Sequence, residues 1–493
     1  MTVRLVPSCG VLAALLVALP AALRPLASFD VFFNIAQGRW ILEHGFPSSD
    51  PFSFTASSAW SCHEWGFGGL LALLEPLLGG WAPTLLSATL LAVAVLLFWH
   101  LLAGMDRVGS PLLPLLFFLA LAVGSWMWSA QRAYLVGPVM LSLVLWLVRQ
   151  APGGKPHRRW WLLVPLVWLW ANLHGSWPLG PAVAGLALAG SWLDDRSGWR
   201  ELPAALPALG LALLVPSLSP DGLRTVLYPL SFLAGDSGAG IWEWGTLDPS
   251  SASSWCLLLL VLLQVLLAWR HGWRWHLGLP ALALLGLAAS AGRHAPLAAL
   301  VLAASCVELW QQPPRRSWRV PALLAKAARL LRIAWQRWRP ARGIVWSGLA
   351  LLLVTGWCLV HPVELAGRMD RGWFPVISLR TLCRQPPGRV LNRYFLGGAV
   401  SALCGPAYPV FIDGRNDLFP RQVHDDYRRL VLLEPGWQRV LEHSGARYVL
   451  WSPLNHGRPL LEHLEHSSRW QLLASEPSGA LFVRRGEPRP AGQ

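Results

Sequence analysis

The strongest constraint on this chain is a series of apolar segments, each close to the length that crosses a lipid bilayer. They lie near 5–23, 84–103, 111–129, 133–149, 160–173, 177–193, 202–216, 253–269, 277–291, 295–310 and 343–361. Only 14% of the 493 residues are charged, and 31 are tryptophan, whose ring favours the boundary between lipid and water. The chain is therefore predicted to be an α-helical polytopic membrane protein with about eleven transmembrane helices.

The loops between these segments predict the orientation of the chain. The first segment has the basic start and apolar centre of a signal peptide, but AALRPLASF is a weak cleavage site, so we interpret it as an uncleaved helix with a cytoplasmic amino terminus. The basic clusters then fall on the cytoplasmic side, as the positive-inside rule requires. They are Arg107; Arg149, Lys155, Arg158 and Arg159; Arg196 and Arg200; Arg270 and Arg274; and 315–342. Because an additional span at 66–80 would reverse every later loop, we interpret that segment as interfacial or re-entrant.

The formal net charge of +15 does not indicate nucleic-acid binding. The basic residues lie between apolar segments, where they set orientation and meet anionic lipid headgroups. One basic stretch, near 320–340, is interpreted either as an amphipathic helix on the cytoplasmic leaflet or as a solvated connector.

After residue 361 the composition becomes that of a soluble domain, which the loop count places outside the cytoplasm. The predicted organisation is a transmembrane domain at 1–361, with a first outer loop at 24–83, and a small extracytoplasmic α/β domain at 362–493. Strands are predicted over 389–395, 408–414, 446–452, 470–476 and 479–485, and helices over 421–433, 435–445 and 458–468. Whether Cys383 and Cys404 form a disulfide in this domain is left open.

Polar residues from several separate loops are predicted to meet at the outer membrane face. They are Asp30, His63, Glu64, Arg132, Asn172, His174, Glu243, Arg293 and His294. Polar groups are costly at membrane depth and usually line a pathway or a pocket, so this set predicts a functional site. Alternative interpretations stay open, because arginines can extend to headgroups and single histidines can have structural roles. No metal-ligand spacing is present, although carboxylates could recruit a divalent cation when substrate binds.

Asp30 lies within a few residues of the end of the first helix. A carboxylate there could act as general base on an acceptor hydroxyl, or it could cap the following helix. Arg132 and Arg293 are suited to a phosphate, because guanidinium groups bind phosphate through paired hydrogen bonds. In the tail, Asp413 and Arg415 of YPVFIDGRNDLF could contact the acceptor, or Asp413 could only fix a turn.

This layout resembles the GT-C superfamily, the polytopic glycosyltransferases that include protein O-mannosyltransferases and the aminoarabinose transferases of lipid A. The resemblance rests on an acidic residue after the first span, a long outer loop with two membrane-associated helices (31–45 and 66–80), about eleven spans and an outer carboxy-terminal domain. A closer resemblance, over nearly the whole chain, is to a group of uncharacterised bacterial membrane proteins. The motifs that carry it are FNIAQGRWILEHGFPSSDPFSFTA, WSCHEW, WANLHGSWPLG, IWEW, RHAPL, NRYFLGG and VFIDGRNDLF.

Two departures from the GT-C pattern bear on activity. The first loop has no paired acidic motif, and Asn34 stands where related sequences carry a histidine, which leaves a weakened or inactive member as an alternative. The resemblance implies that the chain resides in the bacterial inner membrane and transfers a sugar from a polyprenyl-phosphate donor to a hydroxyl or amine on a glycan, lipid or protein acceptor. In that reading Asp30 is catalytic, and the other polar residues bind substrate. A transporter or lipid flippase and a non-catalytic envelope assembly protein are the alternatives.

Overall fold

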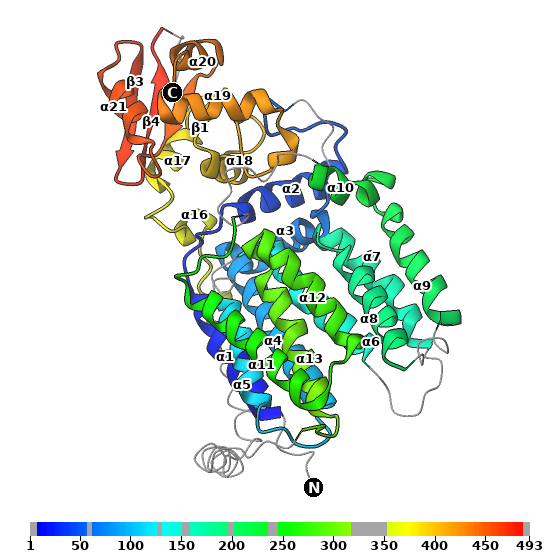
Figure 1. Cartoon of the computed structure of the whole chain (residues 1–493). Coiled ribbons are helices and arrows are strands. Elements are labelled where there is room, and N and C mark those ends of the chain that lie inside the picture. The colour runs from blue at the N-terminus through cyan, green and yellow to red at the C-terminus, as the bar shows by residue number, and fades with distance from the viewer. Residues whose placement is uncertain are drawn as a thin grey trace. The chain divides into compact units, whose positions relative to one another are not determined.

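The computed structural model describes residues 7–56, 62–125, 131–149, 158–195, 202–234, 245–316 and 353–486. The chain divides into two compact units, each made of segments that are far apart in sequence (Figure 1). The helical unit contains Met1–Leu23, Leu85–Ala130 and Tyr134–Trp357, and the mixed unit contains Arg24–Thr84, Gln131–Ala133 and Cys358–Gln493.

The helical unit is built from apolar helices that, apart from α10, overlap the predicted spans, and most of the last predicted span, 343–361, lies outside the described residues. Its α-helices are α1 (Pro7–Leu23), α4 (Ala82–Met105), α5 (Leu113–Val123), α6 (Val136–Val148), α7 (Leu163–Leu173), α8 (Leu179–Asp195), α9 (Leu202–Leu214), α10 (Leu223–Ala234), α11 (Ala252–His271), α12 (Trp275–Ser290) and α13 (Ala295–Trp310). Short 3-10 helices η3 (Ala133–Leu135), η4 (Arg158–Leu162), η6 (Val215–Leu218) and η8 (Gly292–His294) precede or follow them. Leucine and alanine dominate these segments and have high helix propensity, which explains why each apolar run is helical.

Helix α13 forms the centre of the helical unit. It packs against α5, α6, α11 and α12, and its side chains from Ala295 to Val307 are all buried. Small residues on the helix, including Ala298, Ala303 and Ala304, allow neighbouring backbones to approach closely, as is common between helices in membranes.

Helix α11 shows the opposite pattern, because much of its apolar surface is exposed. Trp255, Leu262 and Val265 are each more than half exposed. Within the described residues, two helical runs are long and apolar enough to cross a membrane, namely Trp65–Met105 and Ala252–His271, or three if the bent pair Leu202–Leu218 and Leu223–Pro229 is one span. An exposed apolar helix surface of this kind supports a membrane location. The number of about eleven spans stays a prediction.

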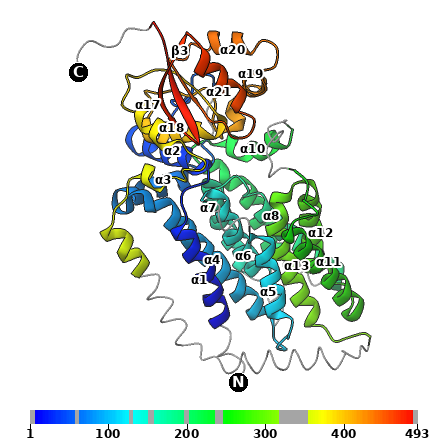
Figure 2. The ribbon, with the colours of Figure 1, turned by 90° about the vertical axis from the view of Figure 1, so that its left-hand side faces the viewer.

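The mixed unit combines a small sheet with helices from two distant parts of the chain (Figures 1 and 2). Its helices are α2 (Asp30–His44), α3 (Trp65–Leu78), η1 (Gly79–Trp81), α16 (Leu365–Arg368), α17 (Val376–Leu382), η9 (Tyr394–Leu396), α18 (Gly397–Cys404), η10 (Asn416–Leu418), α19 (Arg421–Leu432), α20 (Trp437–His443) and α21 (Arg458–His466). Its strands are β1 (Val390–Asn392), β2 (Tyr448–Trp451), β3 (Trp470–Glu476) and β4 (Gly479–Arg484). The sheet order is β1-β2-β4-β3, with β1 parallel to β2 and the other pairs antiparallel.

The first loop is part of the mixed unit rather than a free connection. Single backbone bridges join Ser53 to Val410 and Val410 to Val390 on β1, so the loop extends the edge of the sheet. The strand predicted over 408–414 is reduced to this bridge position, because the backbone bends at Phe411 and again at Gly414. The other predicted strands and helices of the tail are present, and the described residues also contain α18, which the sequence analysis did not predict.

Glycines set the close contacts of helix α2. A Cβ atom on Gly38 would lie 2.0 Å from the carbonyl oxygen of Gly68 on α3, and one on Gly398 of α18 would lie 3.0 Å from the Phe33 amide nitrogen. Helix α2 is therefore held between α3 and α18 at distances that a larger residue would not permit. In both views α18 lies between α17 and α2 (Figures 1 and 2).

Two predictions made from the sequence are not tested by this arrangement. The boundary between a transmembrane domain at 1–361 and an outer domain at 362–493 stays a prediction, because the two compact units are divided at other positions along the chain. The basic stretch near 320–340 lies outside the described residues.

Candidate active site

Asp30 and Arg132 form an ion pair within the mixed unit. Asp30 is the first residue of α2, one position after the residue that caps the helix, and Nη1 of Arg132 donates to its Oδ2 at 3.2 Å. Both side chains remain partly accessible, at 33% for Asp30 and 16% for Arg132. The carboxylate thus lies at the positive end of the helix, where a negative charge is stabilised and solvent can still reach it.

The neighbouring Gln131 explains how Arg132 is positioned. Its side-chain oxygen accepts hydrogen bonds from the amides of Ala27 and Ser28 at 3.2 and 3.3 Å, and its amide nitrogen donates to the Pro25 carbonyl at 3.0 Å. Gln131 is only 3% exposed. It therefore fixes the segment that leads into α2 against the short segment that carries Arg132.

Glu64 is a second carboxylate in this cluster. It is the residue immediately before α3, and its side chain is 14% exposed. Burial raises the pKa of Glu64 above its ordinary value, and the nearby negative charge of Asp30 raises it further, whereas His63, Asn34 and Arg132 act to lower it. The Nε2 atom of His63 lies 3.8 Å from Oε1 of Glu64. A carboxyl group in this environment exchanges a proton at a higher pH than a solvated glutamate does.

Gly414 and Tyr394 form the side of the cluster that comes from the tail. A Cβ on Gly414 would lie 3.1 Å from Oδ1 of Asp30 and 3.3 Å from the Phe33 ring. The hydroxyl of Tyr394 donates to the Gly414 carbonyl at 3.4 Å. Burial raises the pKa of Tyr394, and the negative charge of Asp30 adds to this effect, so the phenol stays protonated. Tyr394 and Gly414 were not among the predicted site residues, although they lie in the motifs NRYFLGG and VFIDGRNDLF.

Asp413 and Arg415, which flank Gly414, form a buried clamp with Asp50 of the first loop. Nη1 and Nη2 of Arg415 donate to Asp50 at 2.6 and 3.2 Å, and Nη2 also donates to Asp413 at 2.6 Å. The three side chains are at most 7% exposed. Burial alone would lower the pKa of Arg415, but the two carboxylates raise it above its ordinary value. This arrangement favours a structural role for Asp413 and Arg415.

A small cavity adjoins both clusters. Its water-accessible volume is about 10 Å³, close to that of one water molecule. The residues that line it are Phe33, Gln37, His63, Glu64, Arg415, Asp417 and Leu418. The side-chain nitrogen of Gln37 is buried and has no hydrogen-bond partner among the described residues, which indicates a place for a small polar molecule.

The helical unit carries a separate group of predicted site residues. The hydroxyl of Tyr134 donates to the Arg293 carbonyl, and the Arg293 guanidinium lies over the Tyr134 ring at 5.5 Å from its centre. The Tyr134 ring also packs edge-on against His174, whose Nδ1 lies 2.7 Å from the Ser176 hydroxyl. Burial lowers the pKa of His294 to about 4, and the adjacent Arg293 charge contributes, so His294 is neutral near pH 7.

The structure thus gathers the predicted residues into two groups. Asp30, Arg132, His63, Glu64, Asp413 and Arg415 are brought together in the mixed unit, and Arg293, His294, Asn172 and His174 lie in the helical unit. Asn172 is 4% exposed, and its amide donates to the Trp168 carbonyl at 2.7 Å. Glu243 lies outside the described residues. Within the described ranges, no three His, Cys, Asp or Glu side chains are grouped as metal ligands.

Comparison with solved structures identifies the fold. The oligosaccharyltransferase of Archaeoglobus fulgidus in its apo form matches 90% of this chain and 69% of its own, with a TM-score of 0.54 and 12% identity. The same enzyme tethered to an acceptor peptide with the sequon NVT matches 97% of this chain and 74% of its own, also at TM-score 0.54 and 12% identity. ArnT from Cupriavidus metallidurans in the apo state matches 96% of this chain and 97% of its own, with a TM-score of 0.51 and 14% identity.

The predicted GT-C fold is therefore confirmed by structures that share it along nearly the whole chain. At 12 to 14% identity the likeness concerns the fold. No protein-family model and no curated protein sequence matches the chain.

Proposed function

We propose that the chain is an integral membrane glycosyltransferase that moves a sugar from a polyprenyl-phosphate-linked donor to an acceptor hydroxyl or amine on the extracytoplasmic face. The observation that carries this proposal is the cluster of Asp30, Arg132 and Glu64, which three separate chain segments assemble in a chain with the GT-C fold. The disulfide between Cys383 and Cys404 supports an extracytoplasmic mixed unit, because disulfides persist in oxidising compartments.

Asp30 would act as the general base. As the acceptor oxygen forms a bond to the sugar C1, the bond from C1 to the donor phosphate oxygen breaks with its electron pair, and the acceptor proton passes to the Asp30 carboxylate. The ion pair with Arg132 holds the carboxylate in one orientation. Polyprenyl phosphate leaves with an additional negative charge, which guanidinium groups stabilise through charge-assisted hydrogen bonds.

Arg293 in the helical unit would bind that phosphate. Its guanidinium lies over the Tyr134 ring, 5.5 Å from the ring centre, and guanidinium groups bind phosphate oxygens through paired hydrogen bonds. His294, which is neutral, would contribute an N–H hydrogen bond rather than a charge. Asn172 and His174 would line the sugar pocket, as predicted from the sequence, and a divalent cation recruited by carboxylates when substrate binds stays a prediction.

The asparagine at position 34 does not leave the cluster without an imidazole. Asn34 is fully buried on α2 beside Glu64, and His63 from the next segment lies on the same carboxylate. We infer that His63, which precedes α3, supplies the imidazole that related sequences have at the position of Asn34 on α2. This arrangement supports an active enzyme.

The test is the substitution Asp30→Asn, with Glu43→Gln as a matched control. Glu43 lies on the same helix and its side chain is 69% exposed. Removal of a general base is expected to slow transfer by about 10²–10⁴-fold, while the control keeps the wild-type rate. Mass spectrometry of envelope glycans and glycolipids from cells that make equal amounts of each protein gives the readout. A sugar modification that depends on the gene but persists at normal levels with Asp30→Asn contradicts the proposed role.

Donor binding is tested separately by native mass spectrometry of protein extracted gently from its own membranes. Polyprenyl phosphate should copurify with the wild type and with Asp30→Asn, and should be depleted in Arg293→Ala. Equal recovery of polyprenyl phosphate in all three proteins argues against the phosphate site at Arg293. No copurification from any of them, with other lipids retained, would favour transport or assembly over transfer.

A further inference from the structure

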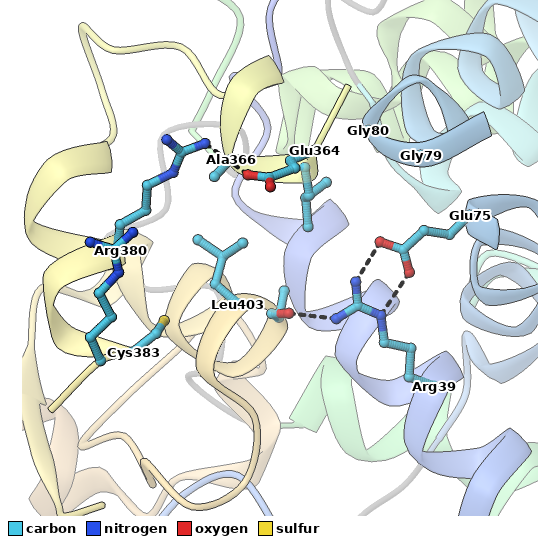
Figure 3. A pocket seen from close by; sticks show the side chains of 12 residues that line it. Arg39, Glu75, Gly79, Gly80, Glu364, Ala366, Arg380, Cys383 and Leu403 are labelled. Atoms are coloured by element: carbon cyan, nitrogen blue, oxygen red, sulfur yellow. Dashed lines mark hydrogen bonds and ion pairs between the residues drawn. The ribbon is translucent and has the colours of Figure 1, made fainter. Parts of the chain in front are cut away.

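The mixed unit contains a second cavity that shares no lining residue with the small cavity beside Glu64. Its volume is about 530 Å³. Its walls include Arg39 on α2, Glu75 on α3, Glu364 next to α16 and Arg380 on α17, together with residues of η1 and α18 (Figure 3). The cavity is large enough for the phosphate of a lipid and part of the headgroup that is attached to it.

The lining of this cavity is polar and carries an excess of positive charge. Three arginines and two glutamates line it. Arg39 is neutralised, because it makes two hydrogen bonds to the Glu75 carboxylate, one of them at 2.7 Å, and another to the Ala402 carbonyl at 2.5 Å. Arg380 pairs with Glu364 at 2.9 Å, with the two side chains 48% and 82% exposed. Arg384 forms no ion pair with any residue in the described part of the chain.

The floor of the cavity requires glycine. Gly79 has a φ of +55°, and a Cβ on it would lie 2.7 Å from the Val363 carbonyl oxygen. A Cβ on Gly80 would lie 2.7 Å from the Glu364 carbonyl oxygen, and the Gly80 amide donates to the Val363 carbonyl at 2.6 Å. The segment that carries Glu364 can therefore approach the floor only because both positions lack a side chain.

The sequence around this floor indicates the depth of a lipid headgroup. Gly79 and Gly80 come immediately before Trp81 and the apolar helix α4, which begins at Ala82. The Trp81 indole donates to the His361 carbonyl at 3.0 Å, and the Arg368 guanidinium lies over its ring at 3.7 Å. Tryptophan and arginine at the end of an apolar helix are typical of the membrane–water boundary.

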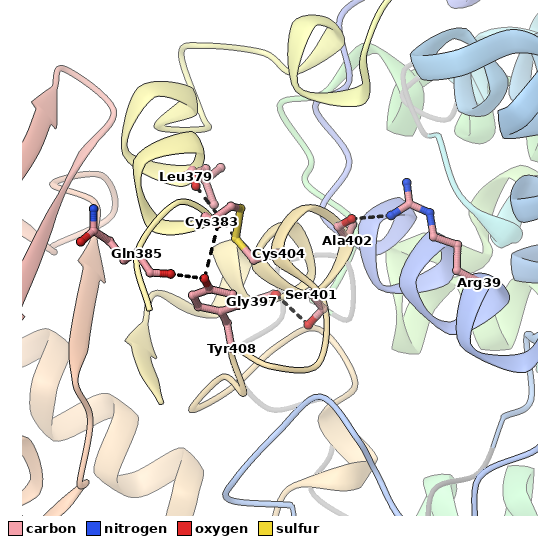
Figure 4. The surroundings of a disulfide bond; sticks show 9 residues. All are labelled: Arg39, Leu379, Cys383, Gln385, Gly397, Ser401, Ala402, Cys404 and Tyr408. Carbon is pink, nitrogen blue, oxygen red and sulfur yellow. Dashed lines mark hydrogen bonds between the residues drawn. A yellow bond between two sulfur atoms is a disulfide. The ribbon is translucent and has the colours of Figure 1, made fainter. Parts of the chain in front are cut away.

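A disulfide fixes the wall that carries the two exposed arginines. Cys383 follows α17 and precedes Arg384, and it is bonded to Cys404 at the end of α18 (Figure 4). Arg39 donates to Ala402 on the same helix α18. The covalent bond thus holds Arg380 and Arg384 opposite the neutral pair of Arg39 and Glu75.

We propose that this cavity binds the phosphate of an anionic membrane lipid, through Arg380 and Arg384, independently of the Asp30 cluster. One phosphodiester with a net negative charge would match the single excess positive charge of the lining. The glycines at the floor leave space for the headgroup. When the lipid binds, the Arg380 guanidinium separates from the Glu364 carboxylate and pairs with the lipid phosphate. An occupied site would hold the mixed unit to lipids beside the start of α4.

The experiment uses the full-length protein in detergent, titrated with phosphatidylglycerol or phosphatidylcholine and followed by native mass spectrometry. The double substitution Arg380→Gln and Arg384→Gln is expected to weaken phosphatidylglycerol binding about 30-fold, because each arginine near a lipid surface contributes about fivefold. Binding of zwitterionic phosphatidylcholine should not change. Glu364→Gln should strengthen phosphatidylglycerol binding about fivefold, since it removes the competing carboxylate. The matched control is Arg458→Gln, a side chain that is 75% exposed on α21.

Each result has a defined meaning. Equal phosphatidylglycerol binding by the wild type and the double variant, or an equal loss in Arg458→Gln, overturns the proposal. Weaker binding in Glu364→Gln also overturns it, because a structural effect rather than charge would then dominate. Displacement of the lipid by millimolar inorganic phosphate would assign the cavity to a soluble anion and not to a lipid. Sugar transfer is tested with Asp30→Asn, whereas lipid binding is tested with the variants of Arg380, Arg384 and Glu364. Failure of the glycosyltransferase proposal would therefore not affect the lipid-binding result, and failure of the lipid proposal would not affect the transfer result.

Discussion

Two clusters of carboxylates and arginines in the mixed unit differ in how deeply their charged side chains are buried. In the Asp30 cluster, the ion pair with Arg132 is at 3.2 Å and Asp30 is 33% exposed. In the clamp, Arg415 makes hydrogen bonds to both Asp50 and Asp413, and each of the three side chains is at most 7% exposed. A carboxylate that must receive a proton from a substrate needs to be accessible, and Asp30 is accessible whereas the carboxylates of the clamp are buried.

The two clusters are physically connected through one residue. Gly414 lies between Asp413 and Arg415 in sequence, and a Cβ added to it would lie 3.1 Å from Oδ1 of Asp30. The buried clamp of Asp50, Asp413 and Arg415 therefore fixes the backbone at Gly414, which lies beside Asp30. This comparison predicts that changes in the clamp affect folding first, whereas changes at the contact point affect activity first.

The largest expected effect on stability follows from Arg415→Met. The substitution leaves Asp50 and Asp413 buried without a counter-charge, which typically costs about 3–5 kcal/mol. For a unit of this size the loss corresponds to a decrease of roughly 6–20 °C in the unfolding midpoint. Tryptophan fluorescence of the purified protein during heating measures the midpoint.

The matched control for this prediction is Arg458→Met, which breaks an exposed pair with Glu462 at 3.0 Å. Such a pair contributes about 0–1 kcal/mol, so its midpoint should stay near that of the wild type. Similar midpoints for the two variants would show that the clamp does not differ from a surface ion pair.

The contrast between the clusters could be predicted only in part from the sequence. The apolar segments predicted the helices, because the length and composition of a span are local properties. Asp30 was identified because it closely follows the first apolar segment, and His63 and Glu64 were identified as polar residues of the first outer loop. The sequence also placed Arg132 on the same side as Asp30, but it suggested a role with phosphate rather than the ion pair that the structure shows.

The clamp was harder to predict, because it joins residues that are 365 positions apart. Asp50 precedes a proline, and a local turn accounts for that pattern; the structure does contain the turn bond, from the Ser53 amide to Asp50 at 2.8 Å. Only the packing of the first loop along Val410 brings Arg415 to the same carboxylate. Gly414 likewise carries no chemical signal of its own, since its importance comes from the absence of a side chain.

A smaller effect, on activity, is expected from Gly414→Ala. The new methyl group would lie 3.1 Å from Oδ1 of Asp30 and 3.3 Å from the Phe33 ring, so the carboxylate must shift by a few tenths of an ångström. A displacement of this size is expected to reduce the transfer rate about tenfold, with little change in the unfolding midpoint. The comparison variant is Gly69→Ala, where a Cβ meets no atom within 4 Å. A midpoint that falls as far as in Arg415→Met would show that Gly414 belongs to the clamp and not to the Asp30 cluster.

The smallest expected effect comes from Asp50→Asn, and it depends on pH. Burial raises the pKa of Asp50 above its ordinary value of 3.8, and the charge of Asp413 raises it further, whereas Arg415 acts to lower it. The folded protein therefore retains the Asp50 proton at a pH where the unfolded chain has released it. The stabilisation of the fold by protonated Asp50 is fully present below about pH 4. It is lost as the pH rises through the raised pKa of Asp50. An asparagine cannot titrate, and it leaves Arg415 balanced by Asp413 alone. The variant should thus be less stable than the wild type by about 1 kcal/mol near pH 4, with a difference that narrows toward pH 7.

Unfolding midpoints of both proteins across this range give the measurement, and a difference that widens with increasing pH would mean that Arg415 stabilises the charged form of Asp50 more than burial opposes it.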